Sequence, residues 1–178
     1  MRKIYAIGET VLDIIFKNGQ PQAAKPGGAM LNSIVSLGRV GQPVHFISEY
    51  ADDDVGSLID AFLHANGVDN SFVHHYRDGK TKLALAFLNE RNDASYTFYE
   101  KYSEKRLDIE FPEIVKNDIL LCGSIYAITD EIRDKFRSLV GAAYRNGAIV
   151  IYDPNFRSAH RHELDRLKPL IVENMSMA

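Results

Sequence analysis

The most informative stretch of this 178-residue chain is residues 3–32, which read KIYAIGETVLDIIFKNGQPQAAKPGGAMLN. Its two apolar runs, at 4–7 and 11–16, are typical of β-strands, and helical spacing of apolar residues begins after Gly28. Two glycines directly before a helix allow the backbone to approach a bound molecule closely. The stretch therefore predicts two strands followed by a helix, with a ligand site near the start of that helix.

Four polar or small residues in this stretch form a candidate ligand site. Asp13 lies inside the second apolar run, where a carboxylate is costly to bury unless it is hydrogen-bonded. A carboxylate accepts hydrogen bonds from hydroxyls, and the amide of Asn32 can both donate and accept. We therefore expect Asp13, Gly27, Gly28 and Asn32 to grip a polyol or a similar small polar molecule.

The composition is that of an ordinary soluble globular protein, with 46% hydrophobic and 25% charged residues. A net charge of −3 with mixed signs gives no basic surface for nucleic acid or for an anionic membrane. The single cysteine, Cys122, excludes an intrachain disulfide, and its apolar neighbours indicate a core residue rather than a nucleophile. Because the first residues lead into a strand without a signal-peptide pattern, we expect a cytoplasmic protein.

Strand and helix patterns alternate along most of the chain. Short apolar runs near 3–8, 44–48, 118–122 and 148–152 are typical of strands buried on both faces. Apolar residues at helical spacing lie between them, with Asn-Gly stops at 66–67 and 146–147, and Thr129 is a candidate helix cap. The alternation predicts one mainly parallel sheet with helices on both faces.

The region from 72 to 102 interrupts this alternation. Residues 82–88 and 95–99 have strand patterns, and the polar segment between them is typical of a hairpin loop. Together with residues 11–16 they are expected to form a separate small sheet, a lid over a ligand or a partner subunit. One face of this lid carries the apolar side chains Leu83, Leu85 and Phe87.

Three local patterns resemble known site motifs but have simpler explanations. Residues 79–81 mimic the end of a phosphate-binding P-loop, yet His74 stands where that loop needs a glycine, and a strand follows. The histidines at 74–75 and 160–162 lack the partners of a complete metal site. Asp52–Asp54 is explained by the preference for acidic residues at a helix start. The chain also lacks the GxGxxG pattern of dinucleotide-binding folds.

The segment Asp153-Pro154-Asn155-Phe156-Arg157 directly follows a predicted buried strand. The carboxyl ends of parallel strands form the edge at which open α/β sheets bind ligands. Arg157 offers a planar donor fork that suits phosphate oxygens. The alternative is a simple turn with Arg157 in a surface ion pair.

Taken together, these segments resemble the ribokinase-like, or PfkB-type, carbohydrate kinases. The resemblance rests on the order and spacing of five features along the whole chain. They are the opening strands with Asp13, the Gly27–Gly28 turn with Asn32, the acidic helix start at 52–54, the lid strands, and the segment 153–157. Within the family, residues 97–99 and the segment 153–157 are most similar to fructokinases and 2-keto-3-deoxygluconate kinases.

The resemblance implies a three-layer α/β/α fold with a β-sheet lid from about 10–24 and 72–103, and 1–178 as one incomplete domain. It also implies phosphoryl transfer from ATP, with Mg²⁺, to a sugar hydroxyl, and a homodimer that pairs through the lid. The sugar would contact Asp13, Gly27, Gly28, Asn32, Phe98 and Tyr99, with Arg157 near the transferred phosphate. Glu100 stands where many relatives have a basic residue, which favours a neutral sugar such as fructose over an acidic one.

Members of this family continue well beyond the point that matches Ala178. Their further segment carries a Gly-Ala-Gly-Asp motif with the catalytic base, most of the nucleotide pocket and the residues near magnesium. We therefore expect no catalytic base, no metal ligand and no turnover in residues 1–178 alone. Two alternatives stay open: a module that binds a sugar without reacting, and a nucleoside kinase in which Phe98 and Tyr99 stack a base.

Overall fold

The structure, a computed structural model, describes residues 2–178, apart from the side chain of Ala159. The larger of its two sheets, the main sheet, is parallel and has the strand order β5-β4-β1-β8-β9. Its strands are β1 (Ile4–Ile7), β4 (Val44–Ala51), β5 (Val68–Tyr76), β8 (Ile119–Gly123) and β9 (Ile149–Asp153). The prediction of one parallel sheet from the four apolar runs is confirmed.

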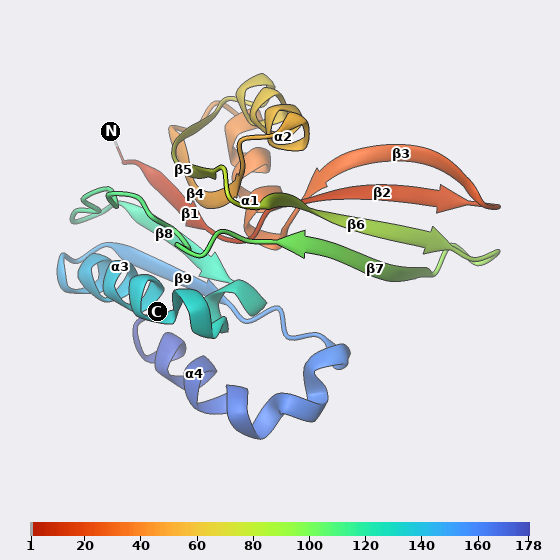
Figure 1. The fold of residues 1–178 in the computed structure, drawn as a ribbon. Helices are drawn as coiled ribbons and strands as arrows, with labels where there is room; N and C mark the ends of the chain where they lie inside the picture. The colour runs from red at the N-terminus through yellow and green to blue at the C-terminus, as the bar shows by residue number, and fades with distance from the viewer. Residues whose placement is uncertain (1) are drawn as a thin grey trace.

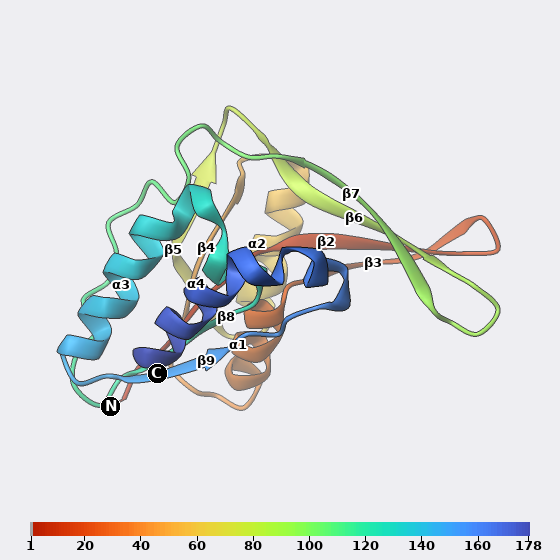
Figure 2. The same cartoon turned by 90° about the horizontal axis from the view of Figure 1, so that it is seen from below.

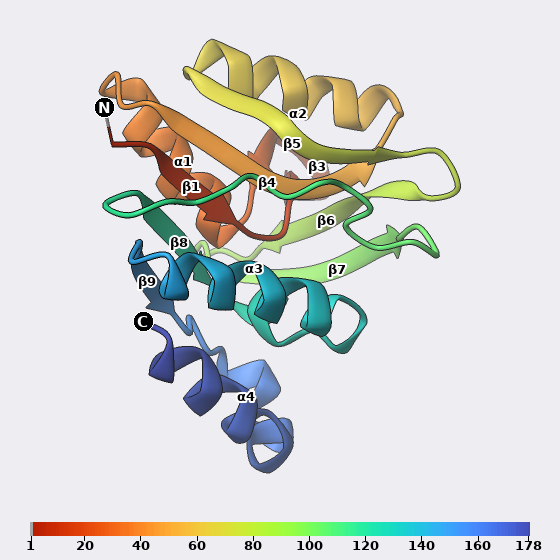
Figure 3. The ribbon, with the colours of Figure 1, turned by 90° about the vertical axis from the view of Figure 1, so that its left-hand side faces the viewer.

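Helices cover both faces of the main sheet, as the alternation predicts. The helices are α1 (Ala29–Arg39), α2 (Asp54–Ala65), α3 (Arg133–Arg145) and α4 (Leu164–Ser176). Figures 1 and 3 show α1 and α2 on one face of the sheet and α3 and α4 on the other. Because side chains alternate along a strand, Ile4 and Ala6 of β1 pack in the core beside α1, while Tyr5 and Ile7 pack beside α3. None of the helices in residues 2–178 has the length and apolar character needed to cross a membrane.

The starts of α2 and α3 differ in how well the sequence predicts them. Asp53 caps α2 by accepting a hydrogen bond from the backbone N–H of Gly56, which confirms the helix-start interpretation of the acidic run. Thr129, in contrast, does not cap α3, because its hydroxyl donates to the carbonyl of Ile125 in a short 3₁₀ turn. A second 3₁₀ turn follows, and α3 begins only at Arg133.

The smaller sheet, which we call the lid, has the strand order β3-β2-β6-β7. Its strands are β2 (Val11–Lys17), β3 (Gln20–Gly27), β6 (Lys80–Leu88) and β7 (Ala94–Lys101). The predicted lid sheet and its hairpin loop are confirmed. Figures 1 and 2 show the far ends of both hairpins projecting well beyond the helices of the main body.

The lid differs from the predicted ranges at two places. Strand β3 extends to Gly27, although its Gln-, Pro- and Ala-rich sequence has low strand propensity; it follows a tight turn at Asn18–Gly19, both with positive φ. Residues 72–76 belong to β5 of the main sheet, so the second lid segment begins only at Lys80. The polar residues Asp69, Asn70 and Ser71 conceal this edge strand from pattern analysis.

The base of the lid is attached to the main sheet by Thr81. Its hydroxyl donates to the carboxylate of Asp53 at 2.7 Å, and it accepts a hydrogen bond from the backbone N–H of Ala51 at 3.1 Å. Thr81 is buried and is part of strand β6. The P-loop-like residues at 79–81 therefore lead into strand β6, as the sequence analysis expects.

Candidate functional site

The inner face of the lid brings two of the predicted site residues into one row. Asp13 on β2 pairs with Ala84 on β6, and Ala84 pairs with Phe98 on β7. Paired residues of adjacent strands point to the same face of a sheet, so all three share one face. Ala84 is small and fully buried in this row. The row therefore places a carboxylate and an aromatic ring on the two sides of a buried alanine.

Asp13 has the environment expected of a ligand-binding carboxylate. It is half-buried, and its burial raises the pKa of the carboxyl above the ordinary value, with no compensating hydrogen bond from the residues that the structure describes. Its carboxylate lies directly against Gly27, where a Cβ atom would collide with Oδ2. Glycine at this position leaves room for the carboxylate, and the acceptor oxygens of Asp13 stay available to hydroxyl donors.

Gly28 fixes the turn into α1. Its φ is +134°, a conformation that side chains disfavour, and a Cβ atom there would collide with the carbonyl oxygen of Glu9. The close approach holds the loop between β1 and β2, which carries Glu9, against the start of α1. Gly28 thus positions Glu9, whose side chain lines the cavity described next.

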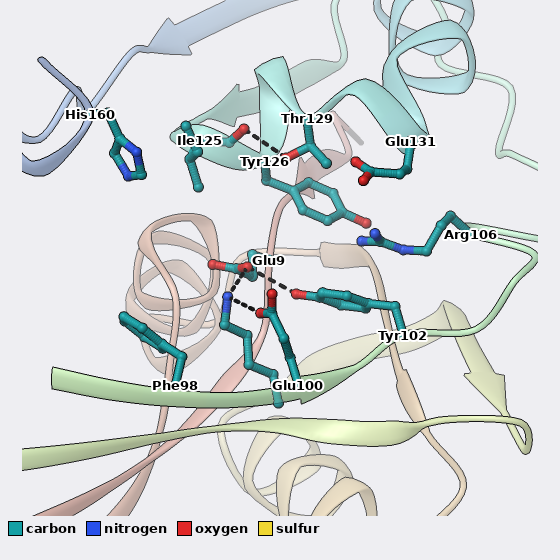
Figure 4. A pocket seen from close by; sticks show the side chains of 11 residues that line it. Glu9, Phe98, Glu100, Tyr102, Arg106, Ile125, Tyr126, Thr129, Glu131 and His160 are labelled. Atoms are coloured by element: carbon teal, nitrogen blue, oxygen red, sulfur yellow. Dashed lines mark hydrogen bonds and ion pairs between the residues drawn. The ribbon is translucent and has the colours of Figure 1, made fainter. Parts of the chain in front are cut away.

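A cavity of about 370 Å³ lies between the lid and the carboxyl end of β8. The lid contributes Phe98 and two charged residues, and the opposite wall consists of the 3₁₀ segment after β8 with His160 (Figure 4). The lining residues are Glu9, Lys82, Phe98, Glu100, Tyr102, Arg106, Ile125, Tyr126, Thr129, Glu131 and His160. The cavity is therefore rich in carboxylates and in aromatic rings.

The ammonium of Lys82 connects the lid to the loop after β1. Its Nζ lies 2.8 Å from Oε1 of Glu9 and 2.7 Å from Oε2 of Glu100. The hydroxyl of Tyr102 donates to the same Oε1 of Glu9 at 3.0 Å. Burial alone would lower the pKa of Lys82, but the two carboxylates outweigh it and raise that pKa above its usual value. Lys82 is therefore charged and paired with both carboxylates.

A second ion pair lies at the cavity wall, where Arg106 pairs with the buried Glu49. Arg106 donates to Oε1 of Glu49 at 2.6 Å, and the guanidinium of Arg106 stacks on the ring of Tyr102, 3.6 Å from its centroid. The Leu107 backbone N–H donates to Oε2 of Glu49 at 2.7 Å, and the Tyr126 hydroxyl donates to Oε1 at 3.2 Å. Glu49 is 2% exposed, and both of its carboxylate oxygens accept hydrogen bonds from these donors. It ties the segment after the lid to the main sheet.

The structure separates the other predicted site residues from this row. Tyr99 follows Phe98 on β7 and therefore points to the opposite face of the lid. Asn32 lines a different surface cavity beside β3, together with Lys25, Pro26 and Arg39. Arg157 is exposed and borders a small cavity after β9. His160 lines both that small cavity and the larger one, so the two adjoin.

Sequence reasoning missed Lys82, Arg106, Glu49 and His160 as cavity or supporting residues. Lys82 has a local signal, because it lies two residues before Ala84 on a strand and so shares its face. Glu49 and Arg106 are 57 residues apart in sequence, and no local sequence pattern indicates that they pair.

Cys122 behaves as the sequence analysis expects, and the neighbouring pair His74–His75 contacts carboxylates. Cys122 is buried in the core, and its burial raises the pKa of the thiol to about 12, which makes it a poor nucleophile. His75 interacts with the carboxylate of Asp60 at 3.1 Å. No three His, Cys, Asp or Glu side chains within residues 2–178 gather as metal ligands would.

Curated proteins with similar sequences include several fructokinases. "Probable fructokinase-6, chloroplastic" of Arabidopsis thaliana is 32% identical over 136 residues, which are 74% of this chain and 35% of that protein. The fructokinase of Vibrio alginolyticus is 23% identical over 180 residues, covering 100% of this chain and 59% of that protein. The chain thus spans less than two thirds of the length of these relatives.

Solved structures share the fold. The apo fructokinase from Vibrio cholerae O395 matches with a TM-score of 0.85 and 22% identity, covering 100% of this chain and 62% of that one. The aminoimidazole riboside kinase from Salmonella enterica, complexed with aminoimidazole riboside and an ATP analogue, matches with a TM-score of 0.81 and 23% identity, over 99% of this chain and 58% of that one. Residues 1–173 match the sequence model of the pfkB family carbohydrate kinases. The chain belongs to this family.

Proposed function

We propose that residues 1–178 hold the sugar in an ATP-dependent transfer of a phosphoryl group to a hydroxyl of a neutral sugar such as fructose. The observation that carries this proposal is the Asp13–Ala84–Phe98 row on the inner face of the lid. Asp13 can accept hydroxyl hydrogen bonds, and the exposed ring of Phe98 can pack against the C–H face of a sugar. Family membership and the fructokinase relatives support the same reading.

The lid has a second task in this proposal. Water competes with the sugar hydroxyl for the phosphoryl group, so a sheet that covers the sugar favours transfer over hydrolysis. ATP and Mg²⁺ are implied by the family, and we assign no ligand of either to the described residues, which hold no ready cluster of metal ligands. A cytoplasmic location stays a prediction of the sequence.

Calorimetric titration of the chain with fructose, ribose and adenosine tests the sugar-binding part of the proposal. We expect heat of binding with fructose, and none with lactate at the same concentrations, because lactate lacks the polyol. Adenosine binding in the absence of fructose binding would favour the nucleoside-kinase alternative, for which the exposed rings of Tyr96 and Phe98, stacked 6.0 Å apart, offer a surface.

We expect residues 1–178 alone to release no ADP from ATP in the presence of fructose. Phosphoryl transfer needs a base within reach of the attacking hydroxyl and preorganised donors for the developing charge. Asp13 is engaged with sugar hydroxyls in our proposal. The measurement is a coupled ADP assay on a sample confirmed by mass to end at Ala178, with a mock purification as control. Fructose-dependent release above that control would mean that the described residues include the catalytic centre.

Arg157 is proposed to face the transferred phosphate. In a protein that includes the rest of the family's length, Arg157→Lys is expected to lower kcat by more than it raises KM for the sugar. Lysine keeps the charge but loses the planar fork. Arg161→Lys, nearby in the following turn and also exposed, is the matched control. An unchanged kcat for Arg157→Lys would contradict this role and favour the alternative, in which Arg157 forms only a surface ion pair.

We also propose a homodimer through the outer face of the lid. This face carries Leu83, Leu85 and Phe87, and Phe87 is 42% exposed and stacks on Phe16. A small sheet with such a face is poorly stable in water by itself. Light scattering at micromolar concentration should give a dimer, and Phe87→Asp should convert it to a monomer. Val40→Asp, at an exposed position after α1, is the control and should stay dimeric. A monomeric unsubstituted chain would contradict the proposal.

A further inference from the structure

Lys82 borders the proposed sugar site. It lies on the same face of β6 as Ala84, two residues before it, which corresponds to about 7 Å along the strand. Its ammonium also lies 4.9 Å from the centroid of the Phe98 ring, which is the proposed packing surface for the sugar. A negatively charged group on a sugar held between Asp13 and Phe98 would therefore find Lys82 within reach.

The positive charges of the cavity are already matched by carboxylates. Lys82 is paired with both Glu9 and Glu100, and Arg106 is paired with the buried Glu49. Glu131 lines the same cavity and adds a further negative charge. A ligand carboxylate entering here would meet an excess of negative charge and no unpaired ammonium or guanidinium among the residues that line the cavity.

The two partners of Lys82 differ in how firmly they are held. Glu9 also accepts a hydrogen bond from Tyr102, and its side chain is 23% exposed. Glu100 is 45% exposed and lies on the outermost strand of the lid, and Lys82 is its partner in the structure. Removing the charge of Glu100 would therefore free one donor of Lys82 while the Glu9 contact, with its Tyr102 bond, remains.

We propose that Glu100 determines the substrate class of this site: it occupies the place beside Lys82 that a ligand carboxylate would take, so that the site selects a neutral ketose over the corresponding sugar acid. This inference rests on the proposed function, because it assumes that the sugar lies between Asp13 and Phe98 on the inner face of the lid. It adds that the discrimination comes from a single exposed carboxylate acting on a cation of the cavity.

A matched pair of ligands tests this inference. Fructose and 2-keto-D-gluconate differ only at C1, which is a hydroxymethyl group in the first and a carboxylate in the second. The measured quantity is the ratio of the two dissociation constants, acid over neutral sugar, obtained by calorimetry on the full chain. We expect fructose to bind more tightly to the unsubstituted chain. In Glu100→Gln the ratio should fall by about tenfold or more, because a hydrogen-bonded charge pair with Lys82 becomes possible.

Three further variants complete the test. Glu90→Gln, the same substitution in the exposed loop of the lid hairpin, should leave the ratio unchanged. The double variant Lys82→Gln/Glu100→Gln should lose the gain, because the receiving cation is gone. Glu100→Ala replaces Glu100→Gln if circular dichroism shows that the latter is not folded.

The outcomes separate this inference from the proposed function. A ratio in Glu100→Gln equal to that of the unsubstituted chain, with normal fructose binding, overturns the inference and leaves the proposed function standing. A gain that persists in the double variant also overturns it, because Lys82 would not be the receptor. A folded unsubstituted chain that binds neither ligand overturns the proposed function, and the inference with it.

Discussion

Replacement of Asp13 by asparagine is expected to lower the affinity for fructose by about 100-fold, because hydrogen bonds from hydroxyls to a charged carboxylate are lost. The half-buried carboxylate of Asp13 receives no hydrogen bond from the described residues and lies against Gly27 on the inner face of the lid. An amide of the same shape preserves the packing but offers one acceptor oxygen and no charge. Calorimetry with fructose measures the loss.

The same substitution is expected to leave thermal stability unchanged or slightly higher at neutral pH. Burial raises the pKa of Asp13, so folding favours the protonated carboxyl. The stability contributed by this group is therefore greatest at low pH and declines as the pH rises through its folded pKa. Asparagine removes that decline, so any gain should vanish in acid. Asp93→Asn in the exposed lid loop is the control, and undiminished fructose affinity in Asp13→Asn would contradict the assigned role.

Replacement of Glu49 by alanine is expected to lower the free energy of unfolding by about 3–5 kcal/mol, which is the usual cost of removing one partner of a buried ion pair. Glu49 is 2% exposed, and its loss leaves the guanidinium of Arg106 and the backbone N–H of Leu107 without their acceptor. Chemical denaturation monitored by circular dichroism measures the change.

Two further variants distinguish this buried pair from ordinary ion pairs. The double substitution Glu49→Leu/Arg106→Met should recover much of the lost stability, because it leaves no unpaired buried charge. Asp52→Ala removes the partner of Arg77, whose side chain is 87% exposed, and should change the free energy by less than about 1 kcal/mol. Equal effects of Glu49→Ala and Asp52→Ala would contradict the structural role of Glu49.

The sequence predicts the main sheet and most of the lid because these elements have regular local patterns. Apolar runs mark β1, β4, β8 and β9, and the acidic cap at Asp53 marks the start of α2. The residue pattern alone does not mark strand β3, which the family resemblance includes only to about residue 24, because edge pairing with β2, rather than propensity, makes it a strand. Strand β5 likewise owes its conformation to its pairing with β4.

The candidate site likewise has a part that the sequence predicts and a part that it does not. A lone carboxylate in an apolar strand and a glycine pair before a helix are visible in the sequence, and the structure brings Asp13 and Gly27 into contact. Lys82 and Glu9 are 73 residues apart in sequence, and no local sequence pattern predicts that they pair. The expected grouping of Tyr99 with Phe98 fails for a simpler reason: consecutive residues of a strand point to opposite faces.

A crystal structure of this chain with bound fructose tests most directly whether the inner face of the lid is the sugar site. We expect fructose hydroxyls within hydrogen-bond distance of the Asp13 carboxylate and the C–H face of the sugar against the Phe98 ring, with Glu100 still paired to Lys82. Fructose ordered instead in the surface cavity beside Asn32 and Arg39, with no ligand contact to Asp13, would contradict the account.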